Sequence, residues 1–448
     1  MCVKLLGSNG SVRVKVSVIG CGYLGAVHAA AMASLGHEVV GVDVDEAKVS
    51  ALREGRPPFF EPGLADLLLE AQDKGSLDFT TDIADAAEAR VHFVCVGTPQ
   101  KPGEFAADVT YVDAAVDALL PHLQPGAVVV GKSTVPVGTA GRLAGLVEPA
   151  GGVLMWNPEF LREGHAVEDT LHPNRLVYGV ADGQAGQTAT EALDEVYASM
   201  LEADTPRLVA DFATAELVKT AANSFLATKI SFINAMAELC ETSGADVTLL
   251  ADAIGMDDRI GRKFLNAGLG FGGGCLPKDI RAFMARAGEL GADQAVAFLR
   301  EIDSINMRRR VRMVDIARDA LGGSFIGKRI TILGAAFKPD SDDVRDSPAL
   351  AVARLIGTQG GVVTVTDPEA VDNASRAFPE LNFVTDTTEA LTGADAVLLL
   401  TEWSEYRDLD PAQVAGLVAN TVLVDGRNVL DPQQWRAAGW TYRALGRP

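Results

Sequence analysis

Membrane-spanning, secreted and nucleic-acid-binding proteins carry features that this sequence lacks. No stretch approaches the ~20 consecutive apolar residues of a membrane-spanning helix, and residues 1–11 do not resemble a secretory signal. The net charge of -21 argues against nucleic-acid binding, because such proteins need basic surfaces. We therefore expect neither a membrane nor a nucleic acid as a partner.

Cysteine is also scarce. The chain has five cysteines, and they are Cys2, Cys21, Cys95, Cys240 and Cys275. Their odd number and irregular spacing indicate neither a disulfide framework nor a zinc site, so we expect no metal. A reduced, cytoplasmic protein is the simplest interpretation. We interpret Cys21, Cys95 and Cys240 as small buried hydrophobes.

Apolar residues make up 48% of the 448 residues, which suits two or three domains with large cores. In the first and last parts of the chain, short apolar runs alternate with helical segments. The runs are 14–19, 38–42, 91–96, 127–132, 153–156, 175–180, 329–333, 362–366, 396–400 and 421–424. This alternation predicts an α/β protein with two doubly wound domains, each built on a parallel sheet covered on both faces.

A long helix is predicted between these two parts. Asp211 can cap a helix that runs to about Thr242, because no Pro or Gly interrupts it and apolar residues recur at helical spacing. Further helical sequence follows to about Leu321, and Gly322 and Gly323 end it. We therefore expect three domains, at 1–205, 206–320 and 321–448.

A glycine-rich turn lies between the first predicted strand and the first predicted helix. It consists of Gly20, Cys21, Gly22, Tyr23, Leu24 and Gly25, which fits the G-x-G-x-x-G pattern of Rossmann-like domains. The following helix N-terminus would face the phosphates of a dinucleotide. Asp43 ends the next strand, where its carboxylate can bind both ribose hydroxyls and repel a 2′-phosphate, so the sequence predicts NAD rather than NADP. A structural turn with a surface aspartate is the alternative.

The most informative segment is a second glycine-rich loop. Residues 270–274 include four glycines, which allow the backbone to approach a ligand closely. Cys275 follows, where a helix N-terminus can stabilise its thiolate, and Lys278 and Asp279 lie within one turn. A cysteine, a cation and a carboxylate so close together favour covalent catalysis by Cys275.

Other polar residues fall where ligands bind in such folds. In open α/β sheets this place is the carboxyl edge of the strands, to which the sequence assigns Thr98, Thr134 and Glu159. On the predicted long helix, Lys219 and Asn223 lie four residues apart and therefore share one face. A solvated polar stripe is the alternative for that face.

Six ordered segments resemble the UDP-glucose/GDP-mannose dehydrogenase family over nearly the whole chain. They lie at 20–25, 132–139, 157–164, 219–223, 270–279 and 334–345. The resemblance implies an enzyme that oxidises a nucleotide sugar to a carboxylate with NAD, through a cysteine-linked thioester. It also implies a C-terminal domain that binds the UDP moiety and a homodimer formed through the helical middle domain.

The resemblance implies residue roles as well. The catalytic residues would be Cys275 as the nucleophile, Lys219 and Asn223 as oxyanion donors, Asp279 and Thr134 as partners of a water and protons, and Glu159 in thioester hydrolysis. Lys48, Thr98, Glu163, Lys278 and Arg345 would join the first glycine turn and Asp43 around NAD. The nucleotide sugar would contact Phe160, Leu161, Arg162, Arg259, Phe271, Gly272, Gly273, Phe337, Lys338 and Arg427. Arg259 would reach into the substrate site of the neighbouring chain.

Two departures from the family pattern affect the choice of substrate. Gly274 and Leu276 flank Cys275 where members often carry Ser and Phe, which leaves the base of the nucleotide open. Pro339 resembles the UDP-glucose group more, so we favour UDP-glucose over GDP-mannose. Two other functions remain as alternatives: a two-electron hydroxyacid or sugar-phosphate dehydrogenase, and a non-catalytic NAD-sensing regulator.

Overall fold

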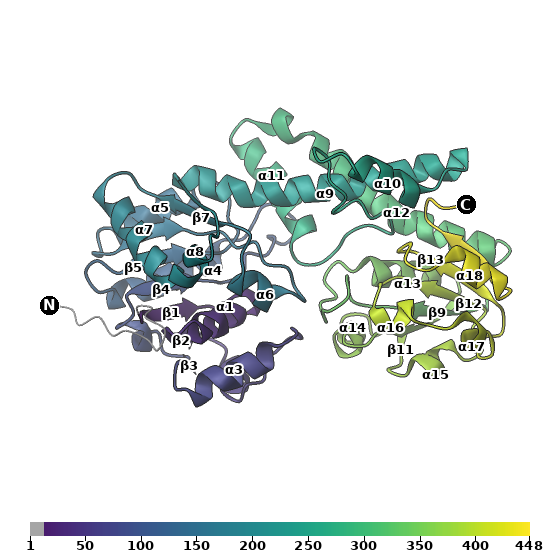
Figure 1. The fold of residues 1–448 in the computed structure, drawn as a ribbon, viewed down its shortest axis with the longest axis horizontal. Helices are drawn as coiled ribbons and strands as arrows, with labels where there is room; N and C mark the ends of the chain where they lie inside the picture. Colours follow the sequence, from purple (N-terminus) through teal and green to yellow (C-terminus); the bar gives the residue numbers. More distant parts are fainter. Residues whose placement is uncertain (1–12) are drawn as a thin grey trace. The chain divides into compact units, whose positions relative to one another are not determined.

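The computed structural model describes residues 13–448, so the predictions for residues 1–11 and for Cys2 lie outside it. The chain forms two compact units. One contains the residues up to Ala222 together with Arg281–Leu290, and the other contains Asn223–Ile280 and Gly291–Pro448. Two long helices, α9 (Phe212–Ser243) and α11 (Leu276–Glu289), contribute to both units (Figure 1). The predicted middle region is thus divided between the two units.

The first unit is built on an eight-stranded sheet with the order β3-β2-β1-β4-β5-β6-β7-β8. Its strands are β1 (Lys15–Ile19), β2 (Glu38–Val42), β3 (Leu77–Thr80), β4 (Val91–Val94), β5 (Val128–Gly131), β6 (Val153–Trp156), β7 (Leu176–Val180) and β8 (Arg207–Ala210). Its helices are α1 (Tyr23–Ser34), α2 (Glu46–Arg53), α3 (Leu64–Asp73), α4 (Thr110–Leu119), α5 (Thr139–Val147), α6 (Ala166–Leu171), α7 (Gln184–Val196) and α8 (Ala198–Glu202).

Both faces of this sheet are buried. Along β5, Val128 and Val130 belong to one hydrophobic cluster with residues of α1 and α7, whereas Val129 belongs to another with residues of α4 and α5. Because successive side chains of a strand point to opposite faces, helices cover the sheet on both sides. The doubly wound architecture predicted from the sequence is confirmed for this unit.

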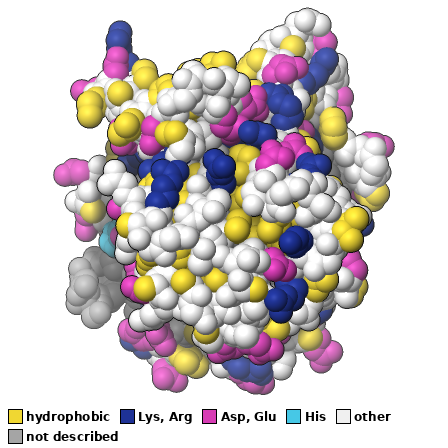
Figure 2. Space-filling model, turned by 90° about the vertical axis from the view of Figure 1, so that its right-hand side faces the viewer, with side chains coloured by type: hydrophobic (Ala, Val, Ile, Leu, Met, Phe, Trp, Pro, Cys, Tyr) yellow, Lys and Arg dark blue, Asp and Glu magenta, His cyan; other side chains and the backbone are white. Residues whose placement is uncertain are grey.

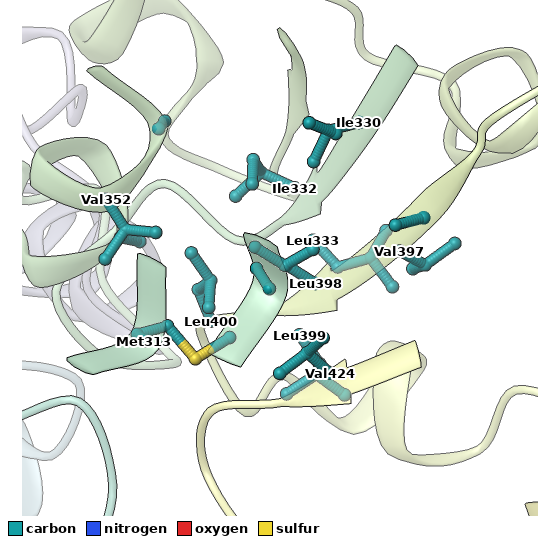
Figure 3. Close-up of a cluster of buried hydrophobic side chains, with 14 of the residues drawn as sticks. Met313, Ile330, Ile332, Leu333, Val352, Val397, Leu398, Leu399, Leu400 and Val424 are labelled. Carbon is teal, nitrogen blue, oxygen red and sulfur yellow. The ribbon is translucent and has the colours of Figure 1, made fainter. Parts of the chain in front are cut away.

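The second unit has a six-stranded parallel sheet with the order β11-β10-β9-β12-β13-β14. Its strands are β9 (Arg329–Leu333), β10 (Val362–Thr366), β11 (Asn382–Phe383), β12 (Ala396–Leu399), β13 (Val422–Asp425) and β14 (Thr441–Ala444). Its other helices are α10 (Val247–Gly255), α12 (Phe298–Ala320), α13 (Pro348–Thr358), α14 (Val371–Ala377), α15 (Thr387–Leu391), α16 (Ser404–Arg407), α17 (Pro411–Ala415) and α18 (Pro432–Ala437). Figure 3 shows its core, in which Met313 of α12 and Val352 of α13 pack with Ile332 of β9 and Leu400 beyond β12.

The two sheets begin with the same turn. After β1, the Gly20 amide donates to Val42 O and the Cys21 amide donates to Asp43, each at 2.8 Å. After β9, the Gly334 amide donates to Thr366 O at 2.8 Å, and the amides of Ala335 and Ala336 donate to Asp367 at 2.7 and 3.0 Å. In the second unit, however, Trp403 Nε1 also donates to the Asp367 carboxylate, at 3.0 Å, and Asp367 is buried. The Asp367 carboxylate is therefore occupied by hydrogen bonds within its own unit.

The structure differs from the predicted strands in two ways. The strands that the sequence did not predict are β3, β8, β11 and β14, and each lies at an edge of its sheet. Edge strands are short and half exposed, so their apolar runs are weak. In addition, β7 pairs antiparallel with β6, because the segment between them contains only the short helix α6 and the chain reverses without crossing the sheet.

The face of the molecule in Figure 2 carries acidic and basic side chains interspersed, with hydrophobic side chains in small separate groups. Local basic groups thus coexist with a net charge of -21. Within residues 13–448, no helix is long and apolar enough to cross a lipid bilayer.

Candidate active site

The first glycine turn has the geometry that a dinucleotide requires. Gly20 has a φ of 87°, and a Cβ atom there would lie 2.6 Å from Cγ1 of Val96. A Cβ atom at Gly25 would overlap the carbonyl oxygen of Gly20, so helix α1 packs closely against the strand end. The N-cap residue of α1, Gly22, makes no side-chain capping bond, and space is open around its Cα. The first amides of α1 are therefore available to a phosphate group.

Asp43 lies at the carboxyl end of β2, as predicted. Its buried carboxylate accepts from the Cys21 amide at 2.8 Å and from the Asp45 amide at 3.1 Å, and it pairs with Lys48 at 2.8 Å. These contacts fix the carboxylate beside the glycine turn, where the ribose of a bound dinucleotide lies in this fold. The arrangement fits NAD, with Lys48 as an adjacent cation.

A carboxylate that the sequence did not single out ties the glycine turn to a distant loop. Glu61 accepts hydrogen bonds from the Tyr23 hydroxyl and from the amides of Gly164 and Ala166, the last two at 2.7 and 2.6 Å. The predicted cofactor residue Glu163 is buried in this loop.

Two other predicted residues of the first unit are placed by local contacts. Leu24 packs at the margin of the core, and Thr98 donates to the carbonyl oxygen of Thr134 at 2.7 Å.

A charged cluster occupies the carboxyl ends of β5 and β6. Lys132 follows β5, and Glu159 follows β6 with its carboxylate 2.9 Å from the Lys132 ammonium. The other carboxylate oxygen of Glu159 accepts from the amides of Phe160 and Leu161. Burial alone would raise the pKa of Glu159, but the charge of Lys132, its hydrogen bond and the nearby Lys219 lower that pKa below its usual value. Glu159 is therefore an ionised carboxylate at neutral pH.

Lys219 reaches the same cluster from helix α9. Its ammonium lies 5.5 Å from the centroid of the Phe160 ring, and the Arg175 guanidinium stacks on that ring at 3.8 Å. Arg175 was not predicted as a site residue, although it begins a predicted strand run. Arg162 is directed differently, because its guanidinium binds both carboxylate oxygens of Asp169.

In the second unit, the cysteine loop is held by helix α12. The Phe271 amide donates to Asn306 Oδ1 at 2.7 Å, and Asn306 Nδ2 donates back to Phe271 O at 3.0 Å. A Cβ atom at Gly272 would overlap the carbonyl oxygen of Asp346, and one at Gly273 would lie 2.8 Å from the Phe337 ring. The glycines therefore allow close contact with the segment that the sequence assigns to substrate binding.

Cys275 lies directly before α11, and its side chain is exposed. Its carbonyl accepts from the Asp279 amide at 2.9 Å, so the cysteine stands at the N-terminus of a 14-residue helix, as predicted. The other described cysteines are buried, and burial raises the pKa of each, to about 12 for Cys95. Among residues 13–448, Cys275 is thus the exposed cysteine, and its position favours a thiolate.

Two predicted catalytic residues meet at the first turn of this helix. Asn223 of α9 donates from Nδ2 to Asp279 Oδ2 at 2.6 Å, and both side chains are buried. Lys278 pairs with the other oxygen of Asp279 at 2.7 Å. The Asp279 carboxylate is therefore held by an amide and an ammonium group, close in sequence to Cys275.

The other predicted substrate and cofactor residues of this unit are placed by local contacts. Arg427 donates to the carbonyl oxygens of Leu400, Gly270 and Phe337, so it connects the cysteine loop to the ends of β9 and β12. The Lys338 ammonium lies over the Phe337 ring at 5.5 Å. The Arg345 guanidinium binds Asp343 and fills the space that a side chain at position 274 would need.

Arg259 is placed apart from these residues. Its side chain is 89% exposed, and its guanidinium pairs with Asp257 of the same loop. The predicted residues thus form two groups, one in each unit. The first comprises the NAD turn with Glu159 and Lys219, to which the structure adds Lys132, and the second comprises the cysteine loop with Asn223 and Asp279.

The sequence matches three domains of one family. Residues 14–201 match the NAD binding domain of the UDP-glucose/GDP-mannose dehydrogenase family, residues 213–308 its central domain and residues 331–432 its UDP binding domain. The first match confirms NAD as the cofactor.

Named relatives align with nearly the whole chain. The UDP-glucose 6-dehydrogenase of Rhizobium meliloti (strain 1021) is 42% identical over 97% of this chain and 100% of that protein. UDP-glucose 6-dehydrogenase TuaD of Bacillus subtilis (strain 168) is 40% identical over 97% and 93%. Among solved structures, a UDP-glucose dehydrogenase from the hyperthermophilic archaeon Pyrobaculum islandicum has a TM-score of 0.89 and 38% identity, and covers 99% of this chain and 100% of that one. The chain belongs to the UDP-glucose/GDP-mannose dehydrogenase family.

Proposed function

We propose that the protein oxidises UDP-glucose to UDP-glucuronate with two molecules of NAD, through a thioester on Cys275. The observation that carries this proposal is an exposed cysteine at the N-terminus of α11, next to the buried Asn223–Asp279 pair. The names of the relatives support UDP-glucose as the substrate. A GDP-mannose dehydrogenase structure from Pseudomonas aeruginosa is less similar, with a TM-score of 0.52 and 27% identity.

The first half of the reaction converts the primary alcohol of the sugar to an aldehyde. NAD supplies the hydride acceptor when bound, and two molecules are needed because an alcohol loses four electrons when it becomes a carboxylate. The hydroxyl proton passes to water, and Asp279 and Thr134 are the residues to which we assign this proton transfer. The Cys275 thiolate then adds to the aldehyde carbon, and the resulting alkoxide is stabilised by the ammonium of Lys219 and the amide of Asn223.

The second half releases the acid. Loss of a second hydride from the thiohemiacetal carbon, and of its hydroxyl proton, gives a thioester on Cys275. Water then adds to the thioester carbonyl, with Glu159 accepting a hydrogen bond from that water. The carbon–sulfur bond breaks, the Cys275 thiolate leaves, and the product is a carboxylate. The protons released pass to solvent.

The yield of NADH distinguishes this function from its two alternatives. We expect two NADH per molecule of acid from UDP-glucose, measured by absorbance together with product chromatography. A two-electron dehydrogenase would give one NADH per product, and an NAD-sensing regulator would give none. GDP-mannose and UDP-N-acetylmannosamine serve as comparison substrates, and turnover of GDP-mannose without turnover of UDP-glucose would contradict the proposed substrate.

Asp43 is expected to select NAD over NADP. We predict that Asp43→Ala lowers the preference for NAD roughly 10-fold or more, equivalent to about 1.4 kcal/mol, because a repulsive carboxylate is removed and Lys48 is left beside the position of a 2′-phosphate. The ratio of kcat/KM for the two cofactors measures the change. Glu46→Ala, which removes a neighbouring exposed carboxylate, is the control and should leave the ratio unchanged. An unaltered ratio in Asp43→Ala would show that another residue selects the cofactor.

We also propose that the protein is a homodimer that buries the exposed face of its central helices. Phe225, Phe232 and Leu239 of α9 are exposed and recur every seven residues, so they lie on one face of the helix. Leu249 and Met256 add two further exposed apolar side chains at and just beyond α10. An exposed apolar face of this kind is suited to contact the same face of a second copy of the chain across a two-fold axis. A cytoplasmic location stays a prediction.

A further inference from the structure

The Lys132 side chain is the buried cation of the first unit that none of the proposed steps uses. This side chain is 4% exposed, and its ammonium lies 2.9 Å from Glu159, 2.9 Å from Asn157 Oδ1 and 3.3 Å from the Tyr197 hydroxyl. An ammonium group has three hydrogens, and these three acceptors satisfy them. Lys132 is therefore fully coordinated by the loop after β6, which supplies Asn157 and Glu159, and by Tyr197.

The acceptors are themselves fixed. The Tyr197 hydroxyl donates to Asn157 Oδ1 at 2.9 Å, and Asn157 Nδ2 donates to Val177 O at 2.9 Å. The Lys132 ammonium also lies 5.8 Å from the Phe93 ring and 5.9 Å from the Tyr197 ring, which favours a cation at this place. The network holds the ammonium against Oε2 of Glu159, whose side chain keeps 17% exposure.

We propose that Lys132 is a positioning residue for thioester hydrolysis, which keeps Glu159 ionised and oriented so that it accepts a hydrogen bond from the attacking water. This inference rests on the proposed function. We assign Lys132 no contact with the substrate, because its side chain is buried and its ammonium is already bound by three acceptors. A buried carboxylate without a cation would become protonated and would donate a hydrogen bond to water instead of accepting one.

Among the titratable groups around the Lys132–Glu159 pair, Lys132 is the main positive charge that acts on the Glu159 carboxylate. The titratable groups that act on Lys132 or Glu159 are His28, Cys95, Tyr197 and Lys219. Burial lowers the pKa of His28. Burial also raises the pKa of Cys95 and the pKa of Tyr197 to about 12. All three side chains are therefore neutral at pH 7. Lys219 is the other cation, and its effect on the Glu159 pKa is smaller than that of Lys132.

The test is the variant Lys132→Met, which removes the charge and retains a long side chain. We expect the two oxidation steps to persist and the release of acid at pH 7 to slow roughly 100-fold, the lower range of a general-base contribution. Mass spectrometry of the quenched protein should then detect the thioester on Cys275. Because the pKa of Glu159 is raised in this variant, the rate of acid release should recover as the pH rises.

Two control variants separate positioning from a structural role. Lys132→Arg keeps the charge and should restore most of the rate at pH 7. The double variant Lys132→Met/Glu159→Gln removes both charges, so it should fold as well as the unmodified protein but still accumulate the thioester, with no recovery at high pH. A double variant that releases acid at the unmodified rate would overturn the inference.

The unmodified enzyme provides a test that does not depend on the folding of any variant. In single turnovers, the rate of thioester hydrolysis should not fall until the pH drops below the ordinary glutamate pKa of about 4.3. If the rate of thioester hydrolysis falls with a midpoint at a higher pH than this, the inference is wrong. It is also wrong if a folded Lys132→Met variant shows the same pH dependence of acid release as the unmodified enzyme. Failure of the proposed function is distinguishable, because the unmodified enzyme would then form no acid from UDP-glucose.

Discussion

Cys275→Ala is expected to abolish the formation of acid from UDP-glucose, with a loss in rate of roughly three orders of magnitude or more. The exposed cysteine at the start of α11 is the group that would hold the aldehyde while the second hydride leaves. Without it, the reaction should stop after one NADH at most, and aldehyde trapped by hydroxylamine should replace the acid. Cys275→Ser should form an ester that hydrolyses slowly, which mass spectrometry can detect on the protein.

Cys240→Ala is the matched control for this experiment. Cys240 belongs to the same unit but is buried in a hydrophobic cluster with Ile233 and Val247. Its loss should cost some stability and leave two NADH per acid. Normal turnover in Cys275→Ala would rule out the covalent mechanism, even if UDP-glucose proved to be the substrate.

Arg259→Ala is expected to raise the KM for UDP-glucose roughly 10- to 100-fold, because hydrogen bonds to charged groups contribute about 1.5–3 kcal/mol each. Arg259 is exposed within its own chain and has a planar fork of donors that suits a diphosphate. The fold should remain intact, since its contacts are confined to a surface loop. Lys263→Ala, which removes an exposed cation of the same region, should change the KM much less.

Hybrid dimers test whether Arg259 acts across the proposed interface. A dimer of one Arg259→Ala chain and one Cys275→Ala chain should regain one working site, because one of its two sites receives both intact residues. Two affinity tags allow the hybrids to be isolated and assayed. Light scattering under assay conditions should give the mass of a dimer, and either active monomers or inactive verified hybrids would contradict a shared site.

The buried centre of each sheet could be predicted from the sequence. The strands β2, β6, β9 and β10 have the predicted bounds, because central strands form continuous apolar runs that end at a glycine or a polar residue. The start of α9 was predicted as well, since the Thr214 amide donates to Asp211 at 2.8 Å. The edge strands were missed because each has only two to four residues or alternates exposed with buried side chains, so none forms a recognisable apolar run.

The supporting residues of the site were beyond sequence reasoning for a different reason. Lys132 stood within a segment that resembles the family, but its partner Tyr197 lies 65 residues away in the chain. Asn306 of α12 holds Phe271 of the cysteine loop, from 35 residues away in the chain. A single sequence gives no signal for such pairs, because each residue alone is compatible with a solvated surface. The chemically reactive residues were easier to identify, since glycine and cysteine patterns are local.

The division of the chain between the two units has a consequence for its synthesis. The chain passes from one unit to the other at 222/223, 280/281 and 290/291. The first unit therefore includes Arg281–Leu290, which contains most of α11 and comes later in the chain than the first part of the second unit. Arg286 of this segment donates to the carbonyl oxygen of Val137, next to α5. On the ribosome, the N-terminal sheet can assemble early, but its unit is completed only after residue 290 has emerged. Neither unit can therefore be obtained whole by cutting the chain at one position.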